Sequence, residues 1–161
     1  MGRCVLWGRA RARARDGAER GAAALEFALI MPLLLVLVFG IISYGYMLSF
    51  RQAISQAAAE GARAAAVAQR DADQVPDAVA AMNDALEGYD VSCDDGTLTR
   101  KDATVGTCEV EIATCAGEAA SVQCVTVTIN YAYQDHPLLT VPGDDIVLPE
   151  SLEYSAVARV S

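Results

Sequence analysis

One long run of apolar and uncharged residues lies near the N-terminus of the chain. It covers residues 27–50, 24 positions without a charged side chain. A helix of that length rises about 36 Å, enough to cross a hydrocarbon core of about 30 Å with some tilt. Tyr44 and Tyr46 lie towards the end of the run, where aromatic side chains favour the membrane interface. The pattern predicts a transmembrane helix over residues 22–50.

The residues after this run keep a helical pattern. Small residues recur every three or four positions, which predicts that the helix continues over residues 51–69. The stripe that they form consists of Ile54, Ala57, Ala58, Gly61, Ala62, Ala65 and Ala68. Such a stripe can pack against a sheet of the same chain or against a helix of another copy, and the sequence leaves both open. A shorter helix is expected over residues 76–87, because Pro76 suits a first turn and Gly88 follows its end.

The pattern then changes to the alternation of β-strands. Residues 110–112 and 122–131 alternate apolar and polar side chains, which predicts two strands joined by a turn over residues 117–121. Residues 152–160 could add a third strand, and residues 135–149, with three prolines, are expected to form an ordered loop. We therefore expect an α+β fold, in which a long N-terminal transmembrane helix extends outside the membrane. There it packs with a short helix and a small antiparallel β-sheet.

Charge is segregated along the chain. The net charge is −9 although 53% of the residues are hydrophobic. Over residues 1–21, six arginines stand against Asp16 and Glu19, whereas residues 51–161 carry six basic and 18 acidic side chains. Because basic flanks stay in the cytoplasm, we expect a single-pass protein of the cytoplasmic (inner) membrane with its N-terminus inside and its C-terminal part outside. The acidic balance argues against nucleic acid as a partner.

These features suggest four segments. Residues 1–21 form a cytoplasmic Arg-rich leader, residues 22–50 the transmembrane helix, residues 51–88 an extracytoplasmic helical segment and residues 89–161 a small β-rich domain. A cleaved secretory signal peptide is the alternative for the N-terminus. Its apolar region would be about 7–15 residues long, so the 24-residue run favours a retained span.

Glu26 stands immediately before the uncharged run. The helix dipole alone would tolerate a carboxylate in the first turns. Its surroundings, RGAAALEFAL over residues 20–29, resemble the type IV prepilin processing motif. Together with Pro32 and Gly40, the block more narrowly resembles the TadE-like family. The later segment QAAAEGARAAA, residues 56–66, is similar to the part of that family that follows the membrane.

The resemblance implies a role in assembly and no enzymatic activity. It implies that prepilin peptidase cuts between Gly21 and Ala22, and that Glu26, followed by Phe27, then pairs with the N-terminal amine of a neighbouring subunit. The protein would be a minor pilin-like component (pseudopilin) of a tight-adherence, Flp-type pilus assembly system, with a pilin-like shape. Its partners would be the membrane, other pilin or pseudopilin subunits and the pilus assembly machinery. The alternative is a bitopic membrane anchor that displays a binding domain unrelated to pili.

Four cysteines lie in the part expected outside: Cys93, Cys108, Cys115 and Cys124. In a small extracytoplasmic domain they suggest two disulfides, for which three connectivities exist. We favour Cys93–Cys108 with Cys115–Cys124, because the second bond would clip the expected hairpin. The spacings lack the paired Cys-x₂-Cys units of structural zinc sites.

Other candidate chemistry is sparse. His136 is the single histidine, next to Asp135, and no nucleophile motif or Gly-rich phosphate loop accompanies it. The acidic pairs at residues 94–95 and 144–145 each neighbour a glycine and fit solvated turns better than calcium sites. We therefore expect no catalysis, no metal and no cofactor.

Overall fold

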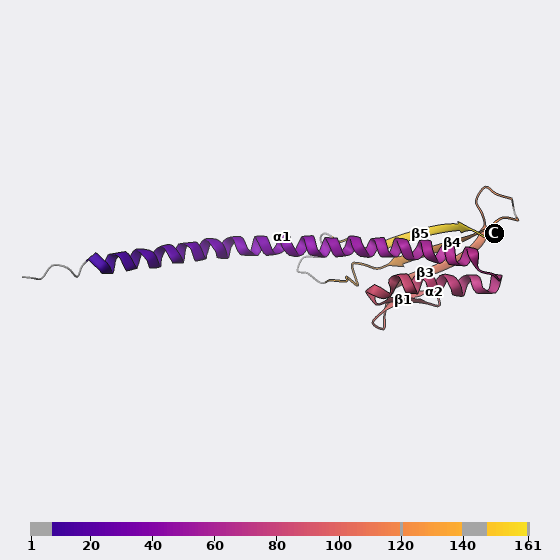
Figure 1. Cartoon of the computed structure of the whole chain (residues 1–161), viewed down its shortest axis with the longest axis horizontal. Coiled ribbons are helices and arrows are strands. Elements are labelled where there is room, and N and C mark those ends of the chain that lie inside the picture. The colour runs from indigo at the N-terminus through magenta and orange to yellow at the C-terminus, as the bar shows by residue number, and fades with distance from the viewer. Residues whose placement is uncertain (1–7, 120, 140–147, 161) are drawn as a thin grey trace, which may run out of the picture. The chain divides into compact units, whose positions relative to one another are not determined.

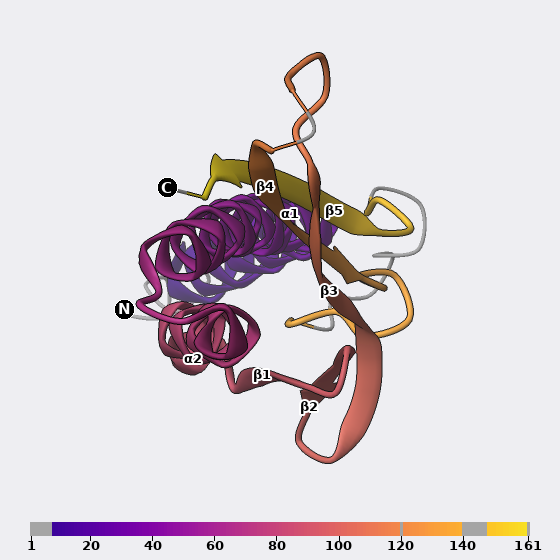
Figure 2. The same cartoon turned by 90° about the vertical axis from the view of Figure 1, so that its right-hand side faces the viewer.

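The computed structural model describes residues 8–119, 121–139 and 148–160. Its helices are α1 (Gly8–Val67), η1 (Asp71–Asp73), α2 (Gln74–Leu86) and η2 (Glu87–Tyr89). Its strands are β1 (Val91–Asp94), β2 (Thr97–Arg100), β3 (Ala103–Thr114), β4 (Gln123–Tyr131) and β5 (Leu152–Arg159). Figure 1 labels these strands except β2, which is labelled in Figure 2. The first residues of the expected leader, the middle of the 135–149 loop with its acidic pair, and residue 120 of the expected turn lie outside the described residues.

The chain divides into two compact units, Met1–Ile42 and Ser43–Ser161. Helix α1 contributes residues to both units, and it continues through Pro32 without a break. The first unit holds the N-terminal part of α1. The second holds the rest of α1, α2 and the whole sheet.

The second unit is a two-layer arrangement of helices on a sheet. The five strands follow one another in the order β1-β2-β3-β4-β5, and every neighbouring pair is antiparallel. Both helices lie on the same face of this sheet, the C-terminal part of α1 beside β4 and β5 and α2 beside β1 (Figure 2). The sequence predicted this α+β arrangement, and the structure confirms it.

Strand alternation builds the core of this unit. Every second side chain of β4 is buried, namely Val125, Val127, Ile129 and Tyr131. They face α1, whose Phe50 is fully buried with its ring centroid 4.8 Å from that of Tyr131 and 5.0 Å from that of Tyr89. Aromatic pairs at such distances stabilise beyond the area that they bury. Phe50, the last residue of the uncharged run, is therefore anchored in the core of the second unit.

The small-residue stripe of α1 packs against other elements of the same chain. Its members from Ile54 to Ala65 are buried in the core of the second unit. A Cβ added to Gly61 would lie 2.8 Å from Cγ of Met82 and 3.3 Å from the carbonyl oxygen of Ala78, both on α2. The glycine therefore permits the close approach of the two helices. Of the two uses left open by the sequence, the structure shows packing within the chain.

The sheet has two more strands than the sequence predicted. Residues 91–94 and 97–100 form a hairpin whose two central residues, Asp95 and Gly96, have positive φ angles of 45° and 79°. An Asp-Gly pair is favoured in such two-residue turns, so the signal was present in the sequence. The strands themselves have only four residues each, too few for alternation to be recognised. Of the acidic pair expected in a turn, Asp95 lies in the turn, whereas Asp94 is the last residue of β1.

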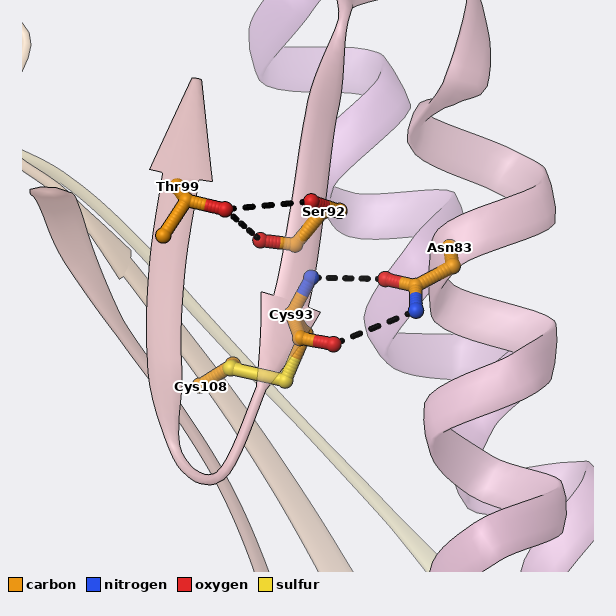
Figure 3. Close-up of a disulfide and its surroundings, with 5 residues drawn as sticks. All are labelled: Asn83, Ser92, Cys93, Thr99 and Cys108. Atoms are coloured by element: carbon orange, nitrogen blue, oxygen red, sulfur yellow. Dashed lines mark hydrogen bonds between the residues drawn. A yellow bond between two sulfur atoms is a disulfide. The ribbon is translucent and has the colours of Figure 1, made fainter. Parts of the chain in front are cut away.

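Helix α2 fastens the edge strand of this hairpin. The side-chain amide of Asn83 accepts a hydrogen bond from the backbone N–H of Cys93 at 2.6 Å and donates one to its carbonyl oxygen at 3.1 Å (Figure 3). On the opposite side of β1, the hydroxyl groups of Ser92 and Thr99 lie 3.1 Å apart. The amide of Asn83 therefore takes the place that a peptide group of a further strand would occupy.

Two disulfides complete the domain. Cys93–Cys108 joins β1 to β3 across β2, and Cys115–Cys124 closes the hairpin of β3 and β4. This is the pairing that the sequence favoured. Both cysteines of the first bond are buried in the core, at 3% and 2% exposure.

Candidate assembly interface

Residues 22–42 of the first unit present an apolar helix surface on all sides. Every residue from 22 to 42 is exposed, and the large apolar side chains between Leu25 and Ile42 are 38–73% exposed. Five consecutive residues, 33–37, are among them, so the exposed apolar surface encircles the helix. Its most apolar 18-residue stretch has a mean hydropathy of 2.7, and none of it is buried by the rest of the chain. A helix apolar all round is suited to a lipid or protein environment rather than to water.

The structure places the four expected processing and assembly residues in consecutive turns of α1. Gly21 and Ala22 lie within its helical backbone, and Glu26 follows about one turn after Ala22. Glu26 is exposed, and Phe27 is 66% exposed. In the described part of the chain, the Glu26 carboxylate has no ion-pair partner. The carboxylate and the aromatic ring are therefore available to a second molecule.

The outward face of α1 changes character after the uncharged run. Exposed side chains there are mostly polar: Arg51, Gln52, Gln56, Glu60 and Arg63. The apolar face of this part is already covered by the sheet and α2. Along α1, the exposed large apolar side chains thus lie mainly before Arg51, from Leu25 to Leu48.

The sheet face that points away from the helices is polar and partly acidic. Glu109 and Glu111 of β3 lie opposite Thr128 and Thr126 of β4 in the register of the sheet. Thr128 donates a hydrogen bond of 3.1 Å to the hydroxyl of Ser155 on β5. This face is exposed to solvent, in keeping with the acidic composition of residues 51–161.

One candidate for other chemistry, His136, takes part in a structural contact through its backbone. Within the described residues, no group of three or more His, Cys, Asp or Glu side chains is placed to hold a metal ion. The backbone carbonyl of His136 accepts a 2.8 Å hydrogen bond from the hydroxyl of Tyr131. Burial raises the pKa of that hydroxyl, and the neighbouring Arg100 guanidinium offsets part of the rise. These groups hold the loop after β4 against the sheet.

Sequence reasoning missed two features of the second unit. One is the pair of hydrogen bonds between the Asn83 side chain and the backbone of Cys93. The sequence indicated it only by placing a polar amide beside the apolar residues of a short helix. The other is a cleft between α1 and the start of β5. Its lining residues come from the two ends of the second unit's sequence, so no local sequence pattern predicts the cleft.

Comparison with known proteins bears on α1. The family model described as TadE-like protein matches residues 21–63, from the expected processing glycine to the turn of α1 that packs on α2. No curated protein and no solved structure matches the chain significantly. The match suggests a Tad pilus-associated protein in a membrane context, and the family is structural and not known for catalysis. Among the described residues, one helix is long and apolar enough to cross a membrane.

Proposed function

We propose that this protein is a minor pilin-like (pseudopilin) component of a tight-adherence, Flp-type pilus assembly system. The observation that carries the proposal is the exposed apolar helix of residues 22–42 with a single carboxylate, Glu26, near its start. The family match over residues 21–63 supports it. The protein acts by helix packing and assembly, with no reaction of its own.

The chain inserts with its Arg-rich N-terminus in the cytoplasm and its disulfide-linked domain outside the inner membrane. The charge distribution supports this orientation. So do the two disulfides, because disulfides persist in oxidising compartments. Prepilin peptidase then cuts between Gly21 and Ala22, which leaves a new α-amine at Ala22.

The carboxylate of Glu26 pairs with the Ala22 amine of a neighbouring pilin or pseudopilin subunit. An ionised side chain drawn into the middle of a membrane costs about 2.5–3.5 kcal/mol on insertion scales. A partner amine offsets that cost only when the two helices lie side by side in the correct register. Phe27 and the apolar side chains that follow supply the contact area between the helices.

A substitution at Glu26 tests this function. Glu26→Ala should leave membrane insertion and the folded outer domain intact, and should sharply reduce surface pili and co-purification with other pilin subunits. Glu60→Ala is the matched control, since Glu60 is an exposed glutamate of the same helix beyond the uncharged run. N-terminal sequencing of the membrane-extracted protein should show a chain that starts at Ala22.

Two results would contradict the proposal. Normal piliation and co-purification of the Glu26→Ala protein would remove the role of the carboxylate. An intact leader in cells that assemble pili would remove the processing step and would favour a bitopic anchor that displays a binding domain.

A further inference from the structure

The end of the uncharged run belongs to the folded core of the second unit. That unit begins at Ser43, and Ser43, Met47 and Phe50 are each at most 4% exposed. They lie at helical spacing on one face of α1, and Ile54 continues the same buried face. Residues 22–42, by contrast, are exposed on every side. The uncharged run therefore includes two different surroundings, and only the first of them is open all round.

Charged side chains are held at the level of this last part of the run. The ring of Tyr89 packs against that of Tyr46, with centroids 6.0 Å apart, and its hydroxyl lies 2.8 Å from the hydroxyl of Ser49. On either side of Tyr89 in the sequence, Glu87 and Asp90 are exposed. Because ionised carboxylates are costly inside a hydrocarbon core, this level of α1 lies outside the core although it carries no charge itself.

Residues 22–42 are by themselves long enough to cross a bilayer. These 21 positions rise about 31 Å, which matches a hydrocarbon core of about 30 Å, whereas the 24-residue run is about 6 Å longer than the core. Two exposed tyrosines follow, Tyr44 and Tyr46, about 3 Å and 6 Å beyond Ile42 along the helix. Tyrosine favours the boundary with the headgroups, because its ring is apolar and its hydroxyl is polar.

We infer that the bilayer encloses residues 22–42 of α1, and that Tyr44 and Tyr46 contact the headgroup layer of its outer leaflet. The membrane span then ends at Ile42 rather than at Phe50. The rest of the uncharged run stands outside the hydrocarbon core as part of the folded second unit. The inference rests on α1 crossing a membrane, as the proposed function does, but it needs neither cleavage of the leader nor assembly of a pilus.

Spin-label depth measurements on the full chain in phosphatidylcholine nanodiscs test this position. Each variant carries one added cysteine at an exposed position of α1 in a Cys4→Ser chain, and the four other cysteines are held in disulfides. Collision rates of the nitroxide with oxygen and with a water-soluble nickel complex report the depth of each label. Leu29→Cys and Leu48→Cys are the decisive pair, because the two positions are equally far from the middle of the uncharged run.

The two possible spans predict different depths for this pair. With residues 22–42 in the bilayer, position 29 lies about 5 Å from the midplane and position 48 about 24 Å from it, beyond the half-thickness of about 15 Å. The Leu29→Cys label should therefore collide mainly with oxygen, and the Leu48→Cys label with the nickel complex. If the whole run were centred in the bilayer, both labels would lie about 14 Å from the midplane and would behave alike.

Matched labels calibrate the depth scale on the same helix. Leu33→Cys lies one residue from the inferred midplane, and Arg63→Cys is an exposed position well beyond the run. The tyrosine surface is tested directly by Tyr44→Trp in a Trp7→Phe chain, which then has a single tryptophan. Lipids brominated near the headgroup should quench its fluorescence more than lipids brominated at the chain ends. Circular dichroism should show the same fold for all variants, because exposed positions are replaced.

Three outcomes would overturn the inference. Equal depths of the labels at positions 29 and 48 would show that the whole run is centred in the bilayer, and would leave the proposed function untouched. Stronger quenching of Tyr44→Trp by chain-end bromines would place that side chain in the hydrocarbon core instead of the headgroup layer. Free collision of the Leu33→Cys label with the nickel complex would show that α1 does not cross the bilayer, and would remove the proposed function as well.

Discussion

Asn83 joins α2 to the edge strand of the sheet, and its removal should loosen that edge measurably. Its side chain forms two hydrogen bonds with the backbone of Cys93, at 2.6 Å and 3.1 Å. Each such bond contributes about 1 kcal/mol net, so Asn83→Ala should remove about 2 kcal/mol. The better helix propensity of alanine returns about 0.5 kcal/mol. The free energy of unfolding should therefore fall by about 1.5 kcal/mol, or slightly more than tenfold in the equilibrium constant.

The assay is urea unfolding of the full chain in detergent micelles. Near-UV circular dichroism would follow the tyrosines around Phe50, because Tyr89 and Tyr131 lose their fixed packing when the outer domain unfolds. Hydrogen exchange would report locally, since the Cys93 amide loses its acceptor and should exchange about tenfold faster. Asp84→Ala is the matched control: this exposed neighbour on α2 should change stability by less than about 0.5 kcal/mol.

Asn83→Asp separates the two bonds. The carboxylate keeps the acceptor for the Cys93 N–H but offers no donor to the carbonyl oxygen, so stability at neutral pH should be reduced. It should recover partly below about pH 4, where a protonated carboxyl group can donate. The reasoning is refuted if Asn83→Ala unfolds at the wild-type urea concentration and leaves the exchange of the Cys93 amide unchanged.

Three further predictions concern packing, covalent links and pH. Gly61→Ala should destabilise the second unit by about 1 kcal/mol net in thermal unfolding, because overpacking against Met82 outweighs the gain in helix propensity. Gly45→Ala is the control and should not destabilise it, because nothing lies within 4 Å of the added Cβ. Replacing Cys93 and Cys108 by serine should cost about 3 kcal/mol and exceed the loss for the shorter, more exposed Cys115–Cys124 loop; equal losses would contradict this. Because the pKa of Tyr131 is raised in the folded chain, the free energy of unfolding should be retained below about pH 10 and should fall above it. Tyr131→Phe should make that fall less steep, and an unchanged slope would argue against Tyr131 as its cause.

Much of the architecture could be predicted from local patterns. The uncharged run and the small-residue repeat both indicated helix, and α1 is continuous through them. The strand over residues 122–131 was recognisable because β-branched side chains alternate with polar ones, and β4 occupies nearly the same residues. The disulfide pairing followed from the same hairpin. Such features depend on neighbours in the sequence, which is why they are readable without a structure.

The hairpin of β1 and β2 could not be predicted from the local sequence pattern. Its four-residue strands are held by contacts from other elements: the Asn83 amide on one edge and the Cys93–Cys108 bond across the sheet. Short segments of this kind have little intrinsic preference, because tertiary partners supply most of their stability. No window of sequence contains those partners.

By itself the sequence determined how charge is distributed along this protein: a basic stretch over residues 1–21, a 24-residue uncharged run and an acidic remainder over residues 51–161. It also drew attention to Glu26, immediately before the run. These are properties of charge and hydrophobicity, which act at each position separately. Only the tertiary structure decided that the small-residue stripe packs within the chain rather than against another copy. It also brought Met47 and Leu152 to one cleft from positions about a hundred residues apart. Both outcomes depend on which surfaces meet when the sheet closes over α1, and burial of apolar area against a specific partner is not encoded at any one position.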